Sequence, residues 1–293
     1  MLSNPNENLP KARRVKILTT DDEDWIPKVV DTLVSGKPCI LPTGCGAYIL
    51  ANAINVKGSN NLKKSIKSKI LLNKAKGRHP DTPVAYTIPP EEISYLVEKE
   101  YRNKVQNVVN KLISKPFGII AQVNNKVPDW HKVYDSLHGV HEKLFVWPDA
   151  LNKGPINDIF KFARKKLRLS VDEFSIIASS ANLFGMGRQI RMNDFEAIYG
   201  QLGDSKEVAY AVKSFEDGGE YSTTRTTIIS TLPFTQKRED VHIVRVGSLS
   251  IEELKKLLPQ AQQLSLTKYL IYTFLTKTRM LINNRLKMQI TPL

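Results

Sequence analysis

The sequence lacks the long apolar runs that a membrane span or a secretion signal requires. None of its apolar segments reaches the roughly 18 residues that read as a membrane-spanning helix. Residues 1–16 are polar and lack the apolar centre of a signal peptide. Cysteine is also scarce, and Cys39 and Cys45 predict neither a disulfide framework nor a zinc site. These absences favour a cytoplasmic protein without a membrane anchor.

Acidic residues are few relative to basic ones. The 29 Asp and Glu stand against 43 Lys and Arg, which gives a net charge of +14. A strongly positive protein attracts phosphate-bearing partners such as nucleotides or RNA through long-range electrostatics. A lysine-rich, solvated surface has the same composition, so charge alone leaves RNA binding open.

The chain divides into a basic polar arm over 1–17, one domain over 18–258, and a basic helical extension over 259–293. Apolar periodicity predicts the elements of the domain. The predicted helices cover 25–34, 62–71, 91–99, 105–113, 155–167, 192–199 and 251–258, and the predicted strands cover 38–42, 84–88, 117–123, 174–178, 208–212, 226–230 and 242–246. Because strands and helices mix without strict alternation, we expect an α/β fold with a twisted mixed sheet and helices on its faces.

A short basic stretch, Lys74 to Pro83, follows a predicted helix and precedes an apolar strand. Lys74, Lys76 and Arg78 lie around Gly77 in this predicted turn. Arg offers a planar fork of donors and Lys a mobile point charge, so the turn suits a polyanion such as a triphosphate. A solvated basic turn is the alternative, and the stretch alone does not separate the two.

The predicted strand over 174–178 ends at Ala178, and Ser180 and Asn182 lie in the segment that follows it. Small hydroxyl and amide groups at the carboxyl end of a strand lie where α/β sheets bind their ligands. We therefore expect these residues to face the same ligand as the basic stretch.

Thr43 follows the strand over 38–42 and is succeeded by Gly44, Cys45 and Gly46. Glycine lets a backbone approach a ligand closely, although a simple turn explains the two glycines equally well. Cys45 could act as a nucleophile. No histidine is placed beside it in the sequence, so a plain small residue is the favoured interpretation.

His138 and His141 have a spacing that suits a pair of metal ligands. Gly139 lies between them, and no acidic or cysteine ligand is clearly placed with them. We therefore predict no metal site in the protein itself.

Five blocks in chain order resemble the motifs of the YrdC-like family, the threonylcarbamoyl-adenylate synthases. They resemble the family's G-x-x-x-x-x-P-T, K-G-R-P-x-x-x-P, S-A-N-x-S-G, P-S-T-V-V and I-L-R-P-G, and they lie at 36–43, 76–83, 180–185, 225–229 and 243–247. Each block alone is weak, whereas five in order are fairly specific. The resemblance covers about residues 20–258 and implies the YrdC-like α/β fold.

The resemblance implies an enzyme that forms an adenylate from L-threonine, bicarbonate and ATP, with Mg²⁺ and release of pyrophosphate. The product of that family serves a tRNA modification, threonylcarbamoyladenosine. On the matching positions, Lys76 and Arg78 would hold the ATP phosphates, with Lys74 as an auxiliary. Ser180 and Asn182 would line the site between nucleotide and carbamate. Cations would neutralise the charge that develops as pyrophosphate leaves, and hydroxyl and amide groups would orient the carbamate.

The remaining residues that the resemblance implies lie on other strands. Arg245 would reach the nucleotide, and Thr43 would face the amino acid. Ala178 and Thr226 complete the set of expected substrate-binding residues.

The chain departs from the family mainly in the segment from Thr43 to Ile49, which lacks the family's acidic residue and its Tyr-Gly-Leu. Thr87 stands where the family has a histidine. These departures concern the amino-acid and carbamate end, so the substrate could be threonine or another amine. Two alternatives stay open: a non-catalytic or repurposed YrdC-like module that binds RNA or a nucleotide, and a specialised carbamoylation enzyme of secondary metabolism.

Overall fold

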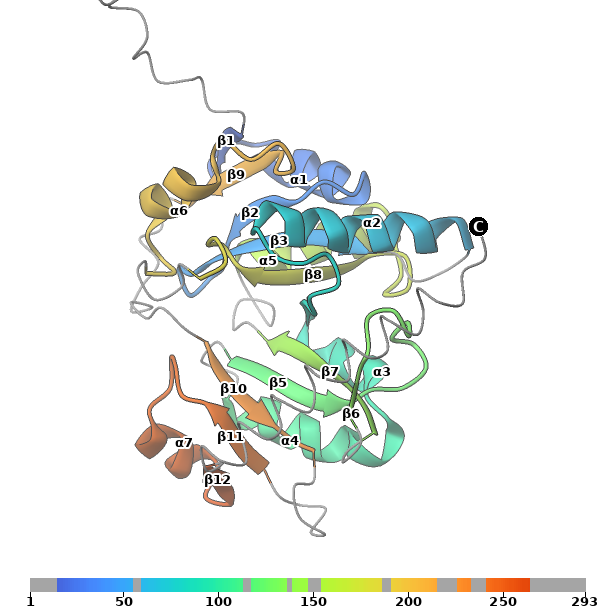
Figure 1. Ribbon diagram of the computed structural model, residues 1–293, viewed down its shortest axis with the longest axis vertical. Helices are drawn as coiled ribbons and strands as arrows, with labels where there is room; N and C mark the ends of the chain where they lie inside the picture. Colours follow the sequence, from blue (N-terminus) through green and yellow to red (C-terminus); the bar gives the residue numbers. More distant parts are fainter. Residues whose placement is uncertain are drawn as a thin grey trace, which may run out of the picture.

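The computed structural model describes residues 15–54, 59–112, 117–135, 139–146, 154–185, 191–214, 226–232 and 241–263. Twelve strands of these residues form one sheet in the order β1-β9-β2-β3-β8-β4-β7-β5-β10-β11-β12, with β6 paired to β7 (Figure 1). The strands are β1 (Lys16–Thr19), β2 (Cys39–Pro42), β3 (Tyr48–Ile54), β4 (Ala85–Thr87), β5 (Phe117–Gln122), β6 (Val133–Asp135), β7 (Gly139–Val146), β8 (Ser175–Ser180), β9 (Tyr210–Lys213), β10 (Thr227–Ser230), β11 (Val241–Arg245) and β12 (Ala261–Gln263). Parallel and antiparallel pairs both occur, so the mixed sheet predicted from the sequence is confirmed.

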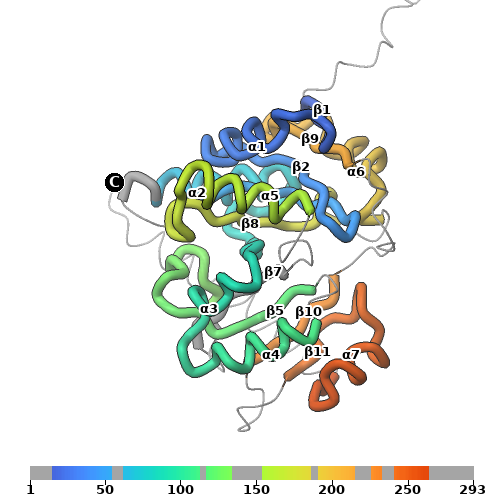
Figure 2. The backbone as a smooth tube through the Cα atoms, turned by 180° about the vertical axis from the view of Figure 1, so that it is seen from behind, coloured from blue at the N-terminus to red at the C-terminus, as the bar shows by residue number. Residues whose placement is uncertain are grey.

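Helices cover both faces of this sheet, as the sequence predicts. They are α1 (Trp25–Val34), α2 (Ser59–Ala75), α3 (Ile93–Leu96), α4 (Arg102–Leu112), α5 (Pro155–Lys161), α6 (Phe195–Leu202) and α7 (Ile251–Leu257). Helix α2 lies in front of β3 and β8 in Figure 1, whereas α1 and α5 lie in front in the reverse view of Figure 2. None of the helices in the described part of the chain has the length and apolarity to cross a bilayer.

Strand β3 is buried on both faces between these helical layers. Leu50 packs in one core cluster with Leu72 of α2. Ile49 and Ala51 pack in the other cluster with Val29 of α1. Successive side chains of a strand point to opposite faces, so an unbroken apolar strand suits a position between two layers of helices.

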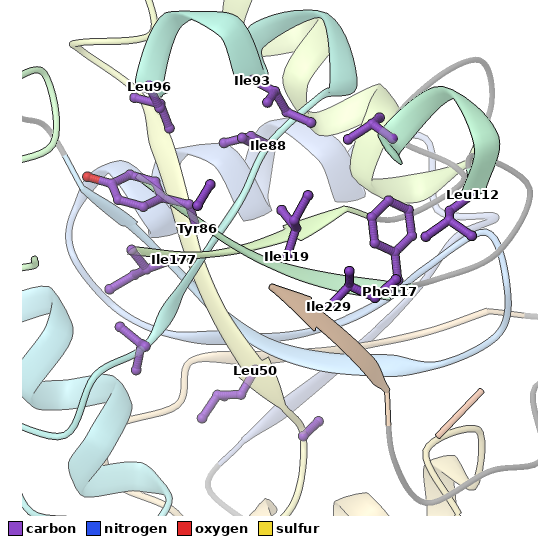
Figure 3. Close-up of a cluster of buried hydrophobic side chains, with 14 of the residues drawn as sticks. Leu50, Tyr86, Ile88, Ile93, Leu96, Leu112, Phe117, Ile119, Ile177 and Ile229 are labelled. Atoms are coloured by element: carbon purple, nitrogen blue, oxygen red, sulfur yellow. The ribbon is translucent and has the colours of Figure 1, made fainter. Parts of the chain in front are cut away.

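Buried apolar side chains also pack against the half of the sheet that contains β5 and β10 (Figure 3). Phe117 and Ile119 of β5 and Ile229 of β10 lie fully buried with Leu112 of α4 and Ile93 of α3. Strands at this end therefore pack on α3 and α4 rather than on α1 and α2.

The two halves of the sheet meet at β4, a strand of three residues that pairs with β8 on one side and β7 on the other. Side chains reinforce this junction. Arg164, on a π-helical turn after α5, forms a double contact with Glu92, at 2.9 Å from Nε to Oε1 and 3.0 Å from Nη2 to Oε2. The Tyr95 hydroxyl donates to Asp172 Oδ1 at 2.7 Å. Both contacts join the α3 region to the segment that leads into β8.

Strands β1, β3, β6 and β12 were not predicted, and one predicted helix was wrong. Strand β3 was missed because a strand buried on both faces lacks the polar–apolar alternation that marks half-buried strands. The helix predicted over 91–99 is a 3₁₀ turn, Pro90–Glu92, followed by the short α3. It ends because Val97 is extended and forms a β-bridge with Val123.

The boundaries of the predicted domain also shift slightly. Strand β1 begins at Lys16, inside the predicted arm, because it pairs in parallel with β9. Strand β12 lies beyond the predicted boundary at 258, since it pairs with β11. Residues 1–14 of the arm and 264–293 of the predicted helical extension lie outside the described residues.

Candidate functional site

The basic stretch forms a tight turn at the end of α2. Gly77 has a φ of 65°, a conformation that glycine adopts readily. The Asn73 side chain, which sequence reasoning missed, is fully buried and donates to the carbonyl oxygens of Pro80 and Thr82, both at 2.8 Å. The backbone N–H of Arg78 also donates to Asn73 O, at 2.9 Å. One asparagine therefore fixes the path of the turn, a role in which its side chain is common.

Lys76 is buried under this turn rather than extended into solvent. Its side chain is 0% exposed, and its Nζ donates to the carbonyl oxygens of Ser180 and Asn182. The N–H of Phe184 donates to Lys76 O at 2.8 Å. Burial, together with the charge of Arg78, lowers the pKa of Lys76 well below its usual value. Lys76 thus ties the basic turn to the end of β8.

Arg78 lies at the surface of the same junction. Its Nη1 donates to Ser179 Oγ at 3.1 Å, and its guanidinium carbon lies 5.7 Å from the centre of the Phe184 ring. Its Nε is buried and has no hydrogen-bond partner among the described residues. Burial lowers the pKa of Arg78. A cation that is anchored and partly exposed is suited to an anionic oxygen.

The end of β8 contributes backbone and side-chain groups to this junction. The Asn182 N–H donates to Ser180 O at 2.9 Å, and Asn182 Nδ2 donates to Leu183 O at 2.8 Å. Ser180 is partly exposed at the last position of β8. Ala178, by contrast, is fully buried in the core cluster beside α1, so its methyl group supports packing.

Lys74 points to a different neighbour. Its Nζ lies 2.9 Å from Glu207 Oε1, and its side chain is exposed whereas that of Glu207 is largely buried. The structure therefore places Lys74 in an ion pair with the segment before β9, and it brings Lys76 and Arg78 to the end of β8.

Arg245 and Thr226 form a second group on the other half of the sheet. Arg245 Nε donates to Thr226 O at 2.9 Å, across the antiparallel pair of β10 and β11. Thr227, which sequence reasoning did not single out, accepts hydrogen bonds through Oγ1 from the N–H of Gly247 at 3.1 Å and of Leu249 at 2.9 Å. This group holds the start of β10 against the turn after β11.

Thr43 begins a closed turn between β2 and β3. Its Oγ1 donates to Ala47 O at 2.8 Å and lies 3.1 Å from Cys45 Sγ. Gly46 has a φ of 83°, and its N–H donates to Thr43 O at 2.8 Å. The turn lies near the basic junction, because the N–H of Ala181 donates to Tyr48 O at 3.2 Å. The Thr43 hydroxyl is buried and already hydrogen-bonded within the turn.

The basic turn contains one histidine and one carboxylate, His79 and Asp81, which are exposed and lie 3.8 Å apart from Nδ1 to Oδ2. Thr87, at the position where a histidine was expected, is fully buried in β4, and its hydroxyl has no partner among the described residues. His138 and the side chain of His141 lie outside the described part of the chain. Among the residues that the structure does describe, no three His, Cys, Asp or Glu side chains are grouped as metal ligands.

No protein-family profile matches the chain, and no curated protein sequence matches it. Solved structures do match. A double variant of P. abyssi Sua5 is 18% identical with a TM-score of 0.57, and the match covers 85% of this chain and 62% of that one. P. abyssi Sua5 complexed with L-threonine gives a TM-score of 0.55 at the same identity and coverage.

Shorter proteins match over nearly their whole length. A hypothetical protein from Streptococcus mutans UA159 is 16% identical with a TM-score of 0.56, and the match covers 85% of this chain and 98% of that one. E. coli YciO is 16% identical with a TM-score of 0.50, over 82% of this chain and 98% of its own. The chain therefore has the YrdC-like fold and spans 62% of the length of the Sua5 chains that it matches.

Proposed function

We propose that the protein is a YrdC-like ATP-dependent synthase. It forms a carbamoyl-adenylate from an amino acid or another amine, bicarbonate and ATP, and it releases pyrophosphate. The YrdC-like fold, the five motif-like blocks and the likeness to a Sua5 structure complexed with L-threonine support this proposal. Threonine is the first substrate to test, with the product serving the tRNA threonylcarbamoyladenosine modification.

The observation that carries the proposal is the contact between the basic turn and the end of β8. Arg78 and Ser179 come from segments about a hundred residues apart, yet Nη1 and Oγ lie 3.1 Å from each other. Arg78 is partly exposed, so its guanidinium group is held by this contact and remains open to a ligand. A donor fixed in advance stabilises developing charge without reorganisation, which is the main electrostatic requirement of a transfer that expels pyrophosphate.

The four residues with expected catalytic roles have three different tasks in this proposal. Arg78 contacts the phosphates and neutralises the charge on the leaving group. Lys76 positions Arg78, since its ammonium group holds the carbonyl oxygens of Ser180 and Asn182. The Ser180 hydroxyl and Asn182 amide orient the carbamate, whose oxygen attacks the α-phosphorus as the bond to pyrophosphate breaks.

Mg²⁺ enters this proposal with ATP. The described residues offer no group of three metal-ligating side chains. Mg²⁺ often keeps several waters and binds through substrate phosphates with only one or two carboxylates. The junction at Arg78 is compatible with such an ion, which would supply further neutralisation of the phosphates.

The Thr43 turn does not favour threonine over another amine as the substrate. Its hydroxyl is buried and donates to Ala47 O, so it is not available to a substrate without rearrangement. The choice of amine therefore has to be measured across a panel of substrates.

Titration calorimetry of MgATP against the wild type, Arg78→Ala and Lys256→Ala tests the proposal. Lys256 is an exposed residue of α7, so its variant removes a positive charge away from the junction. We expect Arg78→Ala to weaken ATP binding at least about tenfold, since it removes charge-assisted hydrogen bonds. Wild-type affinity in Lys256→Ala would exclude a general effect of charge. A wild type that binds no nucleotide would overturn the proposal.

Turnover is tested by pyrophosphate release with bicarbonate and each of the twenty standard amino acids. Release that requires both bicarbonate and one amino acid is the expected result. ATP binding without release for any amino acid would favour a module that binds nucleotide without turnover.

A second candidate, RNA binding, is favoured by the exposed face of α2. The helix contains five lysines and no acidic residue. Lys63, Lys64 and Lys67 are exposed, and none of them forms an ion pair with another described residue. Neighbouring like charges on a helix are destabilising, and an RNA phosphate backbone would relieve them.

Filter binding to tRNA over a range of salt concentrations tests this candidate. Replacing Lys63, Lys64 and Lys67 together by glutamine should reduce the slope of log affinity against log salt by about 2 to 3. The matched control replaces three exposed lysines of other helical segments, Lys165, Lys166 and Lys256. An equal reduction in both triple variants would show that overall charge, and not α2, attracts the RNA.

A further inference from the structure

Phe184 is the most exposed large apolar side chain among the described residues, at 67% of its surface. It lies directly after the Asn182–Leu183 pair, at the position where the resembled motif has serine. Single exposed apolar residues are common, so exposure alone points to nothing. The surroundings of this ring are what make it informative.

Phe184 is joined to the basic turn by two contacts. The Phe184 N–H donates to Lys76 O at 2.8 Å, which fixes its backbone to the basic turn. The guanidinium carbon of Arg78 lies 5.7 Å from the ring centre, within the range of a cation–π contact. Because Lys76 and Arg78 are themselves anchored to the end of β8, the exposed ring lies beside the junction.

An exposed aromatic ring next to an arginine matches the chemistry of nucleotide recognition. Bases stack on Phe, Tyr and Trp rings with little dependence on sequence, since every base has a π face. Arg78 is partly exposed, so its guanidinium charge can attract a phosphate beside the ring. A ligand that satisfies both groups contains a planar base and a phosphate.

We propose that Phe184 stacks on the base of the nucleotide whose phosphates contact Arg78. The inference rests on the proposed function, which requires ATP at this junction, and it adds the residue that recognises the base. It divides the site into a phosphate part at Arg78 and a base part at Phe184.

The test compares MgATP with inorganic tripolyphosphate, which has the same phosphate chain and no base. Calorimetry is carried out on the wild type, Phe184→Leu and Phe184→Tyr. We expect Phe184→Leu to weaken ATP binding at least about fivefold, the low end of the effect of removing a stacking ring. Tripolyphosphate binding should stay unchanged, and Phe184→Tyr should keep the wild-type affinity for ATP.

A tryptophan reporter gives an independent measurement. In Phe184→Trp, ATP should quench the added indole emission, whereas tripolyphosphate should not. The control is Leu257→Trp, because Leu257 is an exposed residue of α7, in the half of the sheet opposite β8 (Figure 1). Its emission should not respond to ATP, and the wild type supplies the background of the native tryptophans.

The outcomes separate the two proposals. If the wild type binds ATP and Phe184→Leu binds it equally well, base stacking by Phe184 is wrong and the proposed function stands. If Phe184→Leu loses ATP and tripolyphosphate alike, the ring supports the junction and does not bind a base. If the wild type binds neither compound, both proposals fail.

Discussion

The junction of Lys76 and Arg78 with β8 and the turn from Thr43 to Ala47 lie at neighbouring strand ends, and they differ in how their polar groups are used. At the junction, the guanidinium group of Arg78 is anchored by Ser179 and remains partly exposed. In the turn, the Thr43 hydroxyl donates to Ala47 O and the segment is closed on itself. One region retains groups that can bind an anion, whereas the other satisfies its groups internally.

The comparison implies that the two regions respond differently to substitution. Changes at the junction should affect both folding and nucleotide binding, because Lys76 holds the backbone that positions Arg78. Changes in the turn should affect local stability and leave nucleotide affinity intact.

Lys76→Met should have the largest effect on stability. The two carbonyl oxygens that Lys76 now satisfies would lose their donor, and a loss of about 2 kcal/mol in the free energy of unfolding is expected. Urea denaturation at pH 7 measures it, with the exposed Lys74→Met as the control. A loss as small as that of the control would show that the Lys76 contacts contribute little.

The difference in the free energy of unfolding between wild type and Lys76→Met should also depend on pH. Its pKa is lowered in the folded state, so the unfolded chain binds the proton more strongly as the pH rises toward 10.5. Deprotonation then favours the folded state, and the wild type should gain stability relative to Lys76→Met in alkaline solution.

Local patterns in the sequence were sufficient to predict several elements. The apolar spacing from Trp25 to Leu33 predicted α1, whose buried residues follow it. The helix predicted over 251–258 corresponds to α7, which Ser250 caps by forming a capping box with Glu253. In both cases the determining contacts lie within one or two helical turns.

The contacts of the junction could not be predicted, because they join residues that are about a hundred positions apart in the sequence. Lys76 donates to backbone carbonyl oxygens, which every residue possesses. The identity of the partner residues therefore gives no sign of this contact in the sequence. Sequence reasoning selected Ser180, whereas Arg78 contacts the hydroxyl of Ser179. Adjacent strand residues face opposite ways, so choosing between two serines requires the register of β8.

Cys39 offers a pH test within the strand that leads to the turn. Burial raises the pKa of its thiol from 9.0 to about 12, so the unfolded chain ionises first as the pH rises above 9. Stability from this group is complete near pH 7 and should be about 1.4 kcal/mol lower at pH 10. Denaturation of wild type and Cys39→Ala at pH 7 and at pH 10 isolates the effect.

Thr43→Val tests whether the turn is structural. The variant keeps the shape of the side chain and removes the donor to Ala47 O, so a loss of about 1 kcal/mol in stability is expected. Thr43→Ser retains the hydroxyl and should lose less. Calorimetry should give unchanged ATP affinity for both variants. A tenfold weaker affinity in Thr43→Val alone would place the hydroxyl in the nucleotide site and remove the distinction between the two regions.

The smallest effect is expected for Lys74, the cation of the basic stretch that lies outside the junction. Its ion pair with Glu207 joins an exposed lysine to a largely buried carboxylate, and pairs near the surface contribute about 0.5 kcal/mol. Lys74→Ala should therefore lower stability by about that amount, and Glu207→Gln should do the same. Because the ion pair directs Lys74 toward the segment before β9, ATP affinity should stay close to the wild-type value. If Lys74→Ala instead weakened ATP binding as strongly as Arg78→Ala, the phosphate site would extend along the basic stretch to Lys74 rather than being confined to the residues at the end of β8.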